Sequence, residues 1–93
     1  MTEVRYLRSP AALTRSVGDQ VLLASADRDE VDVLSGTASV VWRLLEEPRT
    51  LGGLVEMLSA AYRAPRDVIG VDVRALLEDL VGRGWLERDG EGS

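Results

Sequence analysis

Short β-prone segments dominate the first third of the chain. Hydrophobic residues cluster over 13–17 and 21–25, and the triplet Gly18-Asp19-Gln20 between them has the length of a hairpin turn. A second polar turn over 26–29 leads into residues 30–34, where charged residues interleave with branched apolar ones. The pattern therefore predicts a three-stranded antiparallel meander whose third strand is half exposed and lies at a sheet edge.

A helix is predicted directly after the third strand. Apolar residues recur at i, i+3, i+4 and i+7 from Ala38 to Leu45, which is the spacing of one helix face. Ser35 is placed to cap this helix by accepting a hydrogen bond from a free N–H of the first turn. We expect the helix to run to about Glu46, because Pro48 disfavours helical geometry in the residue before it.

Two further helices follow along the chain. Thr50 is a suitable N-cap for an apolar stripe that continues over residues 51–62. Asp67 is a suitable N-cap for a third helix at about residues 68–83, whose own apolar stripe is wide enough for burial in a core. We expect this third helix to lie beside the third strand.

The two ends of the chain show less pattern. Residues 1–10 have no sustained periodicity, so we expect them to be an N-terminal lead-in without a helix or strand. We expect residues 88–93 to form a flexible polar tail. Trp85 and Leu86 predict a short closing strand or an apolar plug. The expected domain, residues 11–87, is α+β: a three-stranded antiparallel sheet followed by three helices, which resembles a winged helix-turn-helix with its sheet first.

Composition excludes most catalytic chemistry. The 93 residues hold no cysteine and no histidine, which removes thiolate chemistry and the commonest general base and metal ligand. The carboxylate pairs Glu46-Glu47 and Glu78-Asp79 are not placed as a catalytic acid and base. No apolar run approaches the ~20 residues that span a bilayer. We expect a cytoplasmic protein that is not an enzyme, with no cofactor, no metal and no membrane partner.

A helix-turn-helix order raises DNA binding as an alternative function. The net charge of −5 opposes it, because affinity for nucleic acid rests largely on cationic side chains that neutralise phosphates. The third helix carries three arginines against four carboxylates, namely Arg66, Arg74 and Arg83 against Asp67, Asp72, Glu78 and Asp79. We therefore expect no nucleic-acid partner, although a winged-helix regulator stays an alternative.

The half-exposed strand and the third helix together suggest a groove. An edge strand has unpaired N–H and C=O groups, which either need protection or accept a partner strand. Glu30 and Asp32 fit the first possibility as charged residues that block aggregation. On the third helix, small and acidic residues border the apolar stripe. They suggest either a shallow cleft with a few polar side chains at its border or simply a solvent-exposed edge of the stripe.

An ordered set of short motifs resembles a known family. The motifs are Val21-Leu22-Leu23, Val33-Leu34-Ser35-Gly36-Thr37-Ala38, Val41-Trp42-Arg43-Leu44-Leu45, Thr50-Leu51 leading to Leu58, and Asp72-Val73 followed by Leu76, Leu77, Leu80, Gly84, Trp85 and Leu86. No single motif is diagnostic, but their order over residues 11–87 is similar to that of the PqqD family, whose members recognise precursor peptides that are made on ribosomes and then modified.

The resemblance implies a non-catalytic domain that binds the leader segment of a precursor peptide. The leader would add to the third strand as an antiparallel strand and pack against the third helix. The implied peptide-binding residues are Glu30, Val31, Asp32, Val33, Leu34, Val68, Asp72, Ala75, Leu76 and Asp79. The chain most resembles the free-standing leader-binding protein of lasso-peptide pathways, which works with a separate cysteine protease and an ATP-dependent cyclase. PqqD proper, in quinone-cofactor biosynthesis, is the close alternative.

Overall fold

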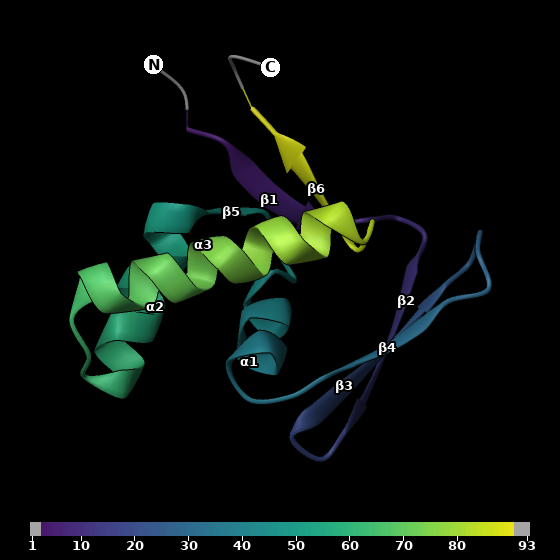
Figure 1. The fold of residues 1–93 in the computed structure, drawn as a ribbon, viewed down its shortest axis with the longest axis horizontal. Helices are drawn as coiled ribbons and strands as arrows, with labels where there is room; N and C mark the ends of the chain where they lie inside the picture. Colours follow the sequence, from purple (N-terminus) through teal and green to yellow (C-terminus); the bar gives the residue numbers. More distant parts are fainter. Residues whose placement is uncertain (1–2, 91–93) are drawn as a thin grey trace.

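The computed structural model describes residues 3–90 and contains two small antiparallel sheets and three helices (Figure 1). In chain order the elements are β1 (Arg5–Arg8), β2 (Ala12–Val17), β3 (Gln20–Ser25), β4 (Val31–Leu34), α1 (Thr37–Leu44), β5 (Arg49–Thr50), α2 (Leu51–Tyr62), α3 (Arg66–Gly82) and β6 (Leu86–Asp89). The strand orders are β2-β3-β4 and β5-β1-β6. The predicted α+β class, with a three-stranded antiparallel meander followed by three helices, is confirmed.

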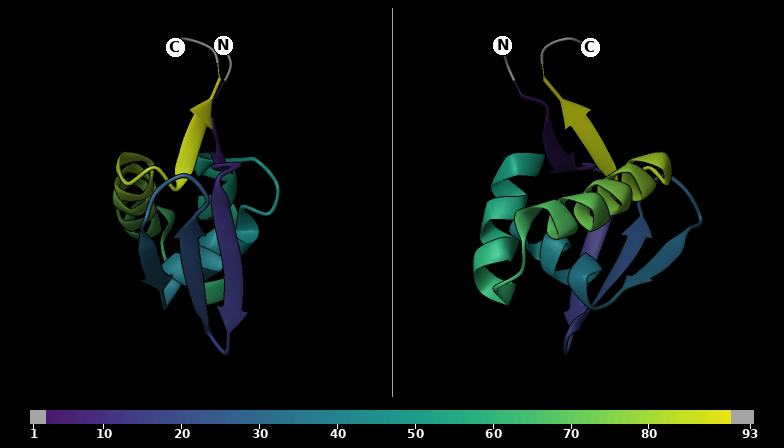
Figure 2. Two further views of the ribbon diagram at one scale, coloured as in Figure 1. Left: turned by 90° about the vertical axis from the view of Figure 1, so that its right-hand side faces the viewer. Right: turned by 60° about the vertical axis from the view of Figure 1, so that its left-hand side comes forward.

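The meander separates an inner face from an outer face. Successive side chains of a strand point to opposite faces, and the register pairs Leu23 with Asp32 and Val21 with Leu34. Val21 and Leu23 are fully buried, so their face, which they share with Leu34, is the inner one. The helices lie against this face only, and the other face of the sheet is left open (Figure 2).

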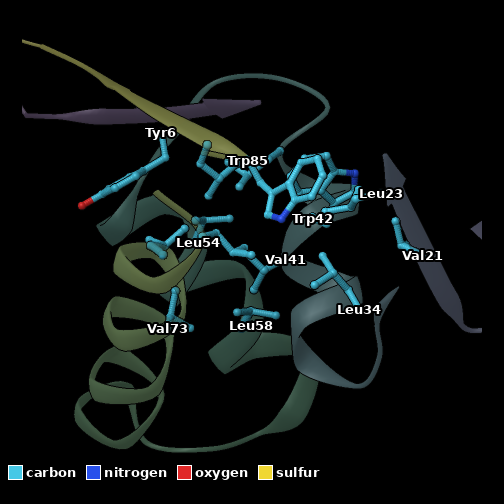
Figure 3. Packing of buried hydrophobic residues seen from close by; sticks show 14 residues of the cluster. Tyr6, Val21, Leu23, Leu34, Val41, Trp42, Leu54, Leu58, Val73 and Trp85 are labelled. Atoms are coloured by element: carbon cyan, nitrogen blue, oxygen red, sulfur yellow. The ribbon is translucent and has the colours of Figure 1, made fainter. Parts of the chain in front are cut away.

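One hydrophobic core joins the helices to both sheets. It contains Trp42 of α1, Leu58 of α2, Val73 of α3 and Trp85, which follows α3 (Figure 3). The indole N–H of Trp42 donates to the hydroxyl of Thr14 on β2 (3.1 Å), so its one polar group is satisfied within the fold. This core fixes α3 in place relative to the meander.

Two of the three predicted helix caps are wrong. The Thr50 hydroxyl does accept from the N–H of Gly53 (3.0 Å), as expected. Gly36 rather than Ser35 precedes α1, with φ 61° and ψ −137°, and no side chain of the described residues caps that helix. Glycine alone adopts such a conformation readily, so the backbone makes the tight entry. Pro65, whose ring fixes φ, precedes α3, and Asp67 lies inside its first turn.

The second sheet corrects the expectations for the two ends of the chain. β1 lies within residues 1–10 and pairs with both β5 and β6, while β6 continues to Asp89. The prediction of a lead-in without an element is therefore wrong over residues 5–8, and the prediction of a tail is wrong over residues 88 and 89. The predicted closing strand is confirmed, with Trp85 and Leu86 buried. Residues 91–93 of the predicted tail lie outside the described residues.

Candidate functional site

The main chain of β4 exposes hydrogen-bonding groups at the edge of its sheet. Ser25 donates its main-chain N–H to the carbonyl of Glu30 (3.2 Å), which marks these residues as a hydrogen-bonded pair of the β3–β4 ladder. Such pairs alternate along an antiparallel ladder, so the main chain of Asp32 also faces β3. The N–H and C=O groups of Val31 and Val33 point the other way. Within residues 3–90 no strand pairs with that side of β4.

The side chains of β4 alternate between the outer and the inner face of the sheet. Val31 and Val33 lie on the outer face of the sheet and are 69% and 54% exposed. Asp32 lies on the inner face, where its side chain is 30% exposed, so it turns toward the end of α3 rather than shielding the edge. The left-hand view of Figure 2 shows β4 as the strand of its sheet that lies nearest α3.

Asp32 ties β4 to the C-terminal end of α3. Its carboxylate accepts from Nη1 of Arg83 (3.3 and 3.2 Å to the two oxygens) and from the indole N–H of Trp85 (2.7 Å). Arg83 also donates through Nε to Asp79 (3.2 Å), one helical turn earlier. The hydrogen bonds to Asp32 and then to Asp79 raise the pKa of Arg83. Arg83 therefore binds a carboxylate of β4, Asp32, and a carboxylate of α3, Asp79, at the same time.

An apolar hollow of about 340 Å³ lies nearer the N-terminal half of α3. The residues that line it come from the β4–α1 junction, from the end of α2 and from α3: Ser35, Thr37, Ala38, Tyr62, Ile69, Asp72, Val73 and Leu76. Asp72 is exposed there, and within residues 3–90 its carboxylate makes no ion pair or hydrogen bond. The hollow therefore offers an apolar cavity with one free negative charge at its rim.

The structure brings together some of the sequence-predicted helix residues and separates others. Asp72 and Leu76 share the hollow beside the β4–α1 junction, and Asp79 faces Arg83. Val68 is exposed on the same helix, outside that lining. Ala75 lines a different hollow, together with Leu51 and other residues of α3. Ala75 thus lines a different hollow from Asp72, and its part in peptide binding stays a prediction.

Sequence reasoning missed two residues of this region. Arg83 stands four residues after Asp79, a spacing typical of a helical ion pair. The local sequence therefore indicates the contact with Asp79. The contact of Arg83 with Asp32 spans 51 positions and had no local signal. Trp85 was predicted to lie in the closing segment. Its hydrogen bond to Asp32 depends on where α3 ends and on Gly84, which turns the chain at φ 86°.

The outer face of the meander is a second exposed surface. Leu13 and Ala24 lie opposite each other in the β2–β3 ladder and Val31 extends their row, while Leu22 and Val33 form the adjacent row on the same face. Leu13 is largely exposed, like the two valines of β4. Exposed apolar patches of this kind mark interaction surfaces more often than isolated apolar residues do.

The acidic residues and the helices of the described part of the chain bear on metal and membrane binding. Residues 3–90 contain no group of three or more carboxylates arranged to hold a metal ion. In the turn before β4, Arg28 instead pairs with Glu30 (3.0 Å) and donates to the carbonyl of Arg83 (3.0 Å). None of the helices in this range combines the length and apolar character that crossing a bilayer requires.

Comparison with known proteins identifies the family. The model of the family described as coenzyme PQQ synthesis protein D (PqqD) matches residues 20–86, which include β3, β4 and all three helices. The chain belongs to the PqqD family. The matched range therefore contains both the free edge of β4 and the α3 residues described above.

Three individual proteins resemble this PqqD-family chain. A PqqA binding protein of Gluconobacter oxydans (strain 621H) is 39% identical over 58% of the chain and 56% of its own length. A second, from Bradyrhizobium diazoefficiens, is 41% identical over 50% of the chain and 45% of its own length, so the chain spans about half of these curated relatives. The structure of TbiB1 in complex with the TbiA(beta) leader peptide superposes with a TM-score of 0.81, at 26% identity, over 94% of this chain and 96% of that one.

Proposed function

We propose that this protein is a non-catalytic leader-peptide-binding protein that captures a ribosomal precursor peptide by strand addition to β4. The observation that carries the proposal is the edge of β4 beside α3, where the main-chain groups of Val31 and Val33 pair with no other strand of residues 3–90. Strand addition gains affinity from main-chain hydrogen bonds and specificity from pockets for alternate side chains. The likeness to TbiB1, which was solved with a leader peptide, and to two PqqA binding proteins supports a leader as the ligand.

The register of β4 predicts which leader residues are recognised. Leader residues that pair opposite Val31 and Val33 share the outward direction of those side chains, because residues directly opposite each other lie on one face of a sheet. Leader residues opposite Asp32 and Leu34 point inward, toward α3. The residue opposite Leu34 is directed to the side of the apolar hollow at Leu76 and Asp72. We expect leader recognition to follow a period of two, with inward positions more sensitive to substitution.

The outer face of the meander supports the partner part of the proposal. In the lasso-peptide type of pathway, the bound precursor is presented to a separate cysteine protease and an ATP-dependent cyclase. The exposed side chains of Leu13, Val31 and Val33 form an apolar surface that the leader itself would not cover. A processing enzyme that covers this surface would lie next to the outward-facing leader residues.

A PqqA-type precursor is the second candidate ligand, and the two PqqA binding proteins favour it. The two candidates use the same groove and differ in the peptide that fills it. Genes beside this one would separate them, because a short precursor gene with a protease and a cyclase indicates the lasso type. A quinone-cofactor cluster would indicate PqqD proper.

The direct test is a titration with synthetic leaders of the short precursors that are encoded beside the gene. Trp85 bonds to Asp32, so its fluorescence is placed to report events at β4. We expect a saturable change with the cognate leader and none with a peptide of the same composition in scrambled order. Main-chain amide shifts concentrated at Val31 and Val33 would support strand addition. No saturable change with any neighbouring precursor would overturn the proposal.

A further inference from the structure

We infer that Asp32, Arg83 and Trp85 form a clip that holds β4 at a fixed spacing from α3, so that Asp32 is a positioning residue for the leader and not a contact with it. The inference rests on the proposed function, because it concerns the width of the groove that a leader would occupy. It differs from the sequence prediction, in which Asp32 belonged to the peptide-binding surface.

The first argument for the clip is the number of hydrogen bonds that the Asp32 carboxylate already accepts within the fold. It accepts three hydrogen bonds, two from Arg83 and one from the indole N–H of Trp85. Trp85 is 2% exposed, so its N–H would lose its partner if β4 moved away from the helix. A buried donor without a partner is costly, which makes this contact resist separation of the strand from the α3–β6 corner.

The second argument is that the clip makes further hydrogen bonds on its helix side and on its strand side. Asp79 of α3 accepts from Arg83 on the helix side. On the strand side, Arg28 precedes β4 and donates to the main-chain carbonyl of Arg83 (3.0 Å). Arg28 also lies close to Gly84, where an added Cβ would come within 2.7 Å of its guanidinium. Side-chain hydrogen bonds therefore connect β4, the C-terminal end of α3 and the loop before β4.

The third argument is the contrast between the two ends of the groove. At the clip, charged side chains bridge strand and helix, whereas the hollow near Leu76 is apolar and its one carboxylate, Asp72, has no partner within residues 3–90. A polar hollow of about 540 Å³ lies at the clip, and Asp32, Arg83 and Trp85 are among the residues that line it. The next inward position, opposite Leu34, lies beside Ser35, which lines the apolar hollow. The groove thus favours a polar leader residue at the position opposite Asp32 and an apolar residue at the position opposite Leu34.

The test compares leader affinity in Arg83→Ala, Asp32→Asn and the double variant, using a labelled synthetic leader of the neighbouring precursor as the probe. Asp32→Asn keeps an acceptor for Trp85 but removes the charge that attracts Arg83. Since both charged side chains are partly exposed, we expect each single variant to weaken binding by about two- to fivefold. If the two residues act as one clip, the double variant will bind the leader with the same affinity as the single variant of lower affinity.

Arg66→Ala is the matched control. Arg66 is also an exposed arginine of α3 that pairs with a carboxylate, Glu56 of α2, but this pair lies outside the groove. We expect this control to bind the leader like the wild-type protein, and all variants are compared below their melting temperatures. Wild-type affinity in both single variants, or effects that multiply in the double variant, would overturn the clip. Absence of binding by the wild-type protein would instead overturn the proposed function, and the clip with it.

Discussion

A proline at Val33 tests the strand-addition geometry directly. The N–H of Val33 points to the open edge of β4, so Val33→Pro removes a donor that a leader would use and leaves the β3–β4 ladder complete. Proline is tolerated in edge strands where its missing N–H faces away from the neighbouring strand. The Val33 side chain is more than half exposed, so its loss removes little core contact.

The expected effect on leader affinity follows from one main-chain hydrogen bond. A net contribution of about 0.5–1.5 kcal/mol is lost with the donor, and the leader carbonyl that faced it is left without a partner. A total of roughly 1–2 kcal/mol corresponds to an increase in Kd of about five- to thirtyfold. The free energy of unfolding should change by less than this, because no hydrogen bond between described residues is removed.

The matched control is Ser16→Pro on β2, the other edge strand of the same sheet. Ala26 donates to the carbonyl of Ala11 (2.8 Å), and the resulting alternation directs the N–H of Ser16 away from β3. Both variants would be titrated with the same leader and melted in parallel. Val33→Pro should lose affinity while Ser16→Pro keeps it. Equal affinity of the two variants, with both folded, would refute the assignment of β4 as the docking edge.

Three further substitutions test other parts of the structure. Asp72→Arg reverses the one unpaired carboxylate at the apolar hollow, so we expect leader binding about tenfold weaker and a melting temperature close to that of the wild-type protein, measured by titration and thermal unfolding. Gly36→Ala places a side chain at φ 61° and should lower the free energy of unfolding by about 1–3 kcal/mol in urea titration, although its Cβ would meet no neighbour within 4 Å. Leu77→Ala empties a fully buried position of α3 and should cost about 2–5 kcal/mol in the same assay, and a loss below 1 kcal/mol would contradict its place in the core.

The meander and the helix faces were predictable because their signals are local. The turn predicted at residues 18–20 lies between two β-prone runs, and its first two residues form the β2–β3 connection. Thr50 stands directly before its apolar stripe. Within the apolar stripe predicted for the third helix, Val73, Leu77 and Leu80 are buried. Periodicity within a window of about a dozen residues decides such elements, so no knowledge of distant partners is needed.

The second sheet was not predictable from the same signals. β1 has four residues, and its partners β5 and β6 follow it by more than 40 positions. The pairing of Tyr6 with Arg49 and Arg88 depends on the helices first bringing these segments together. A strand of this length has too few alternating positions to stand out from a loop, which is why residues 5–8 gave no signal.

The orientation of β4 shows a further limit of sequence patterns, and it bears on function. Alternation indicates that two faces differ, but the partners available inside the fold decide which face is buried. Here a buried indole N–H and Arg83 draw Asp32 inward, and the valines are left outside. Asp32, one of the two charged residues that were expected to protect the edge from other strands, is therefore bonded inside the fold instead. An edge with unpaired main-chain groups and exposed valines is prone to pair with another strand, so a dedicated peptide partner explains it better than protection against aggregation does.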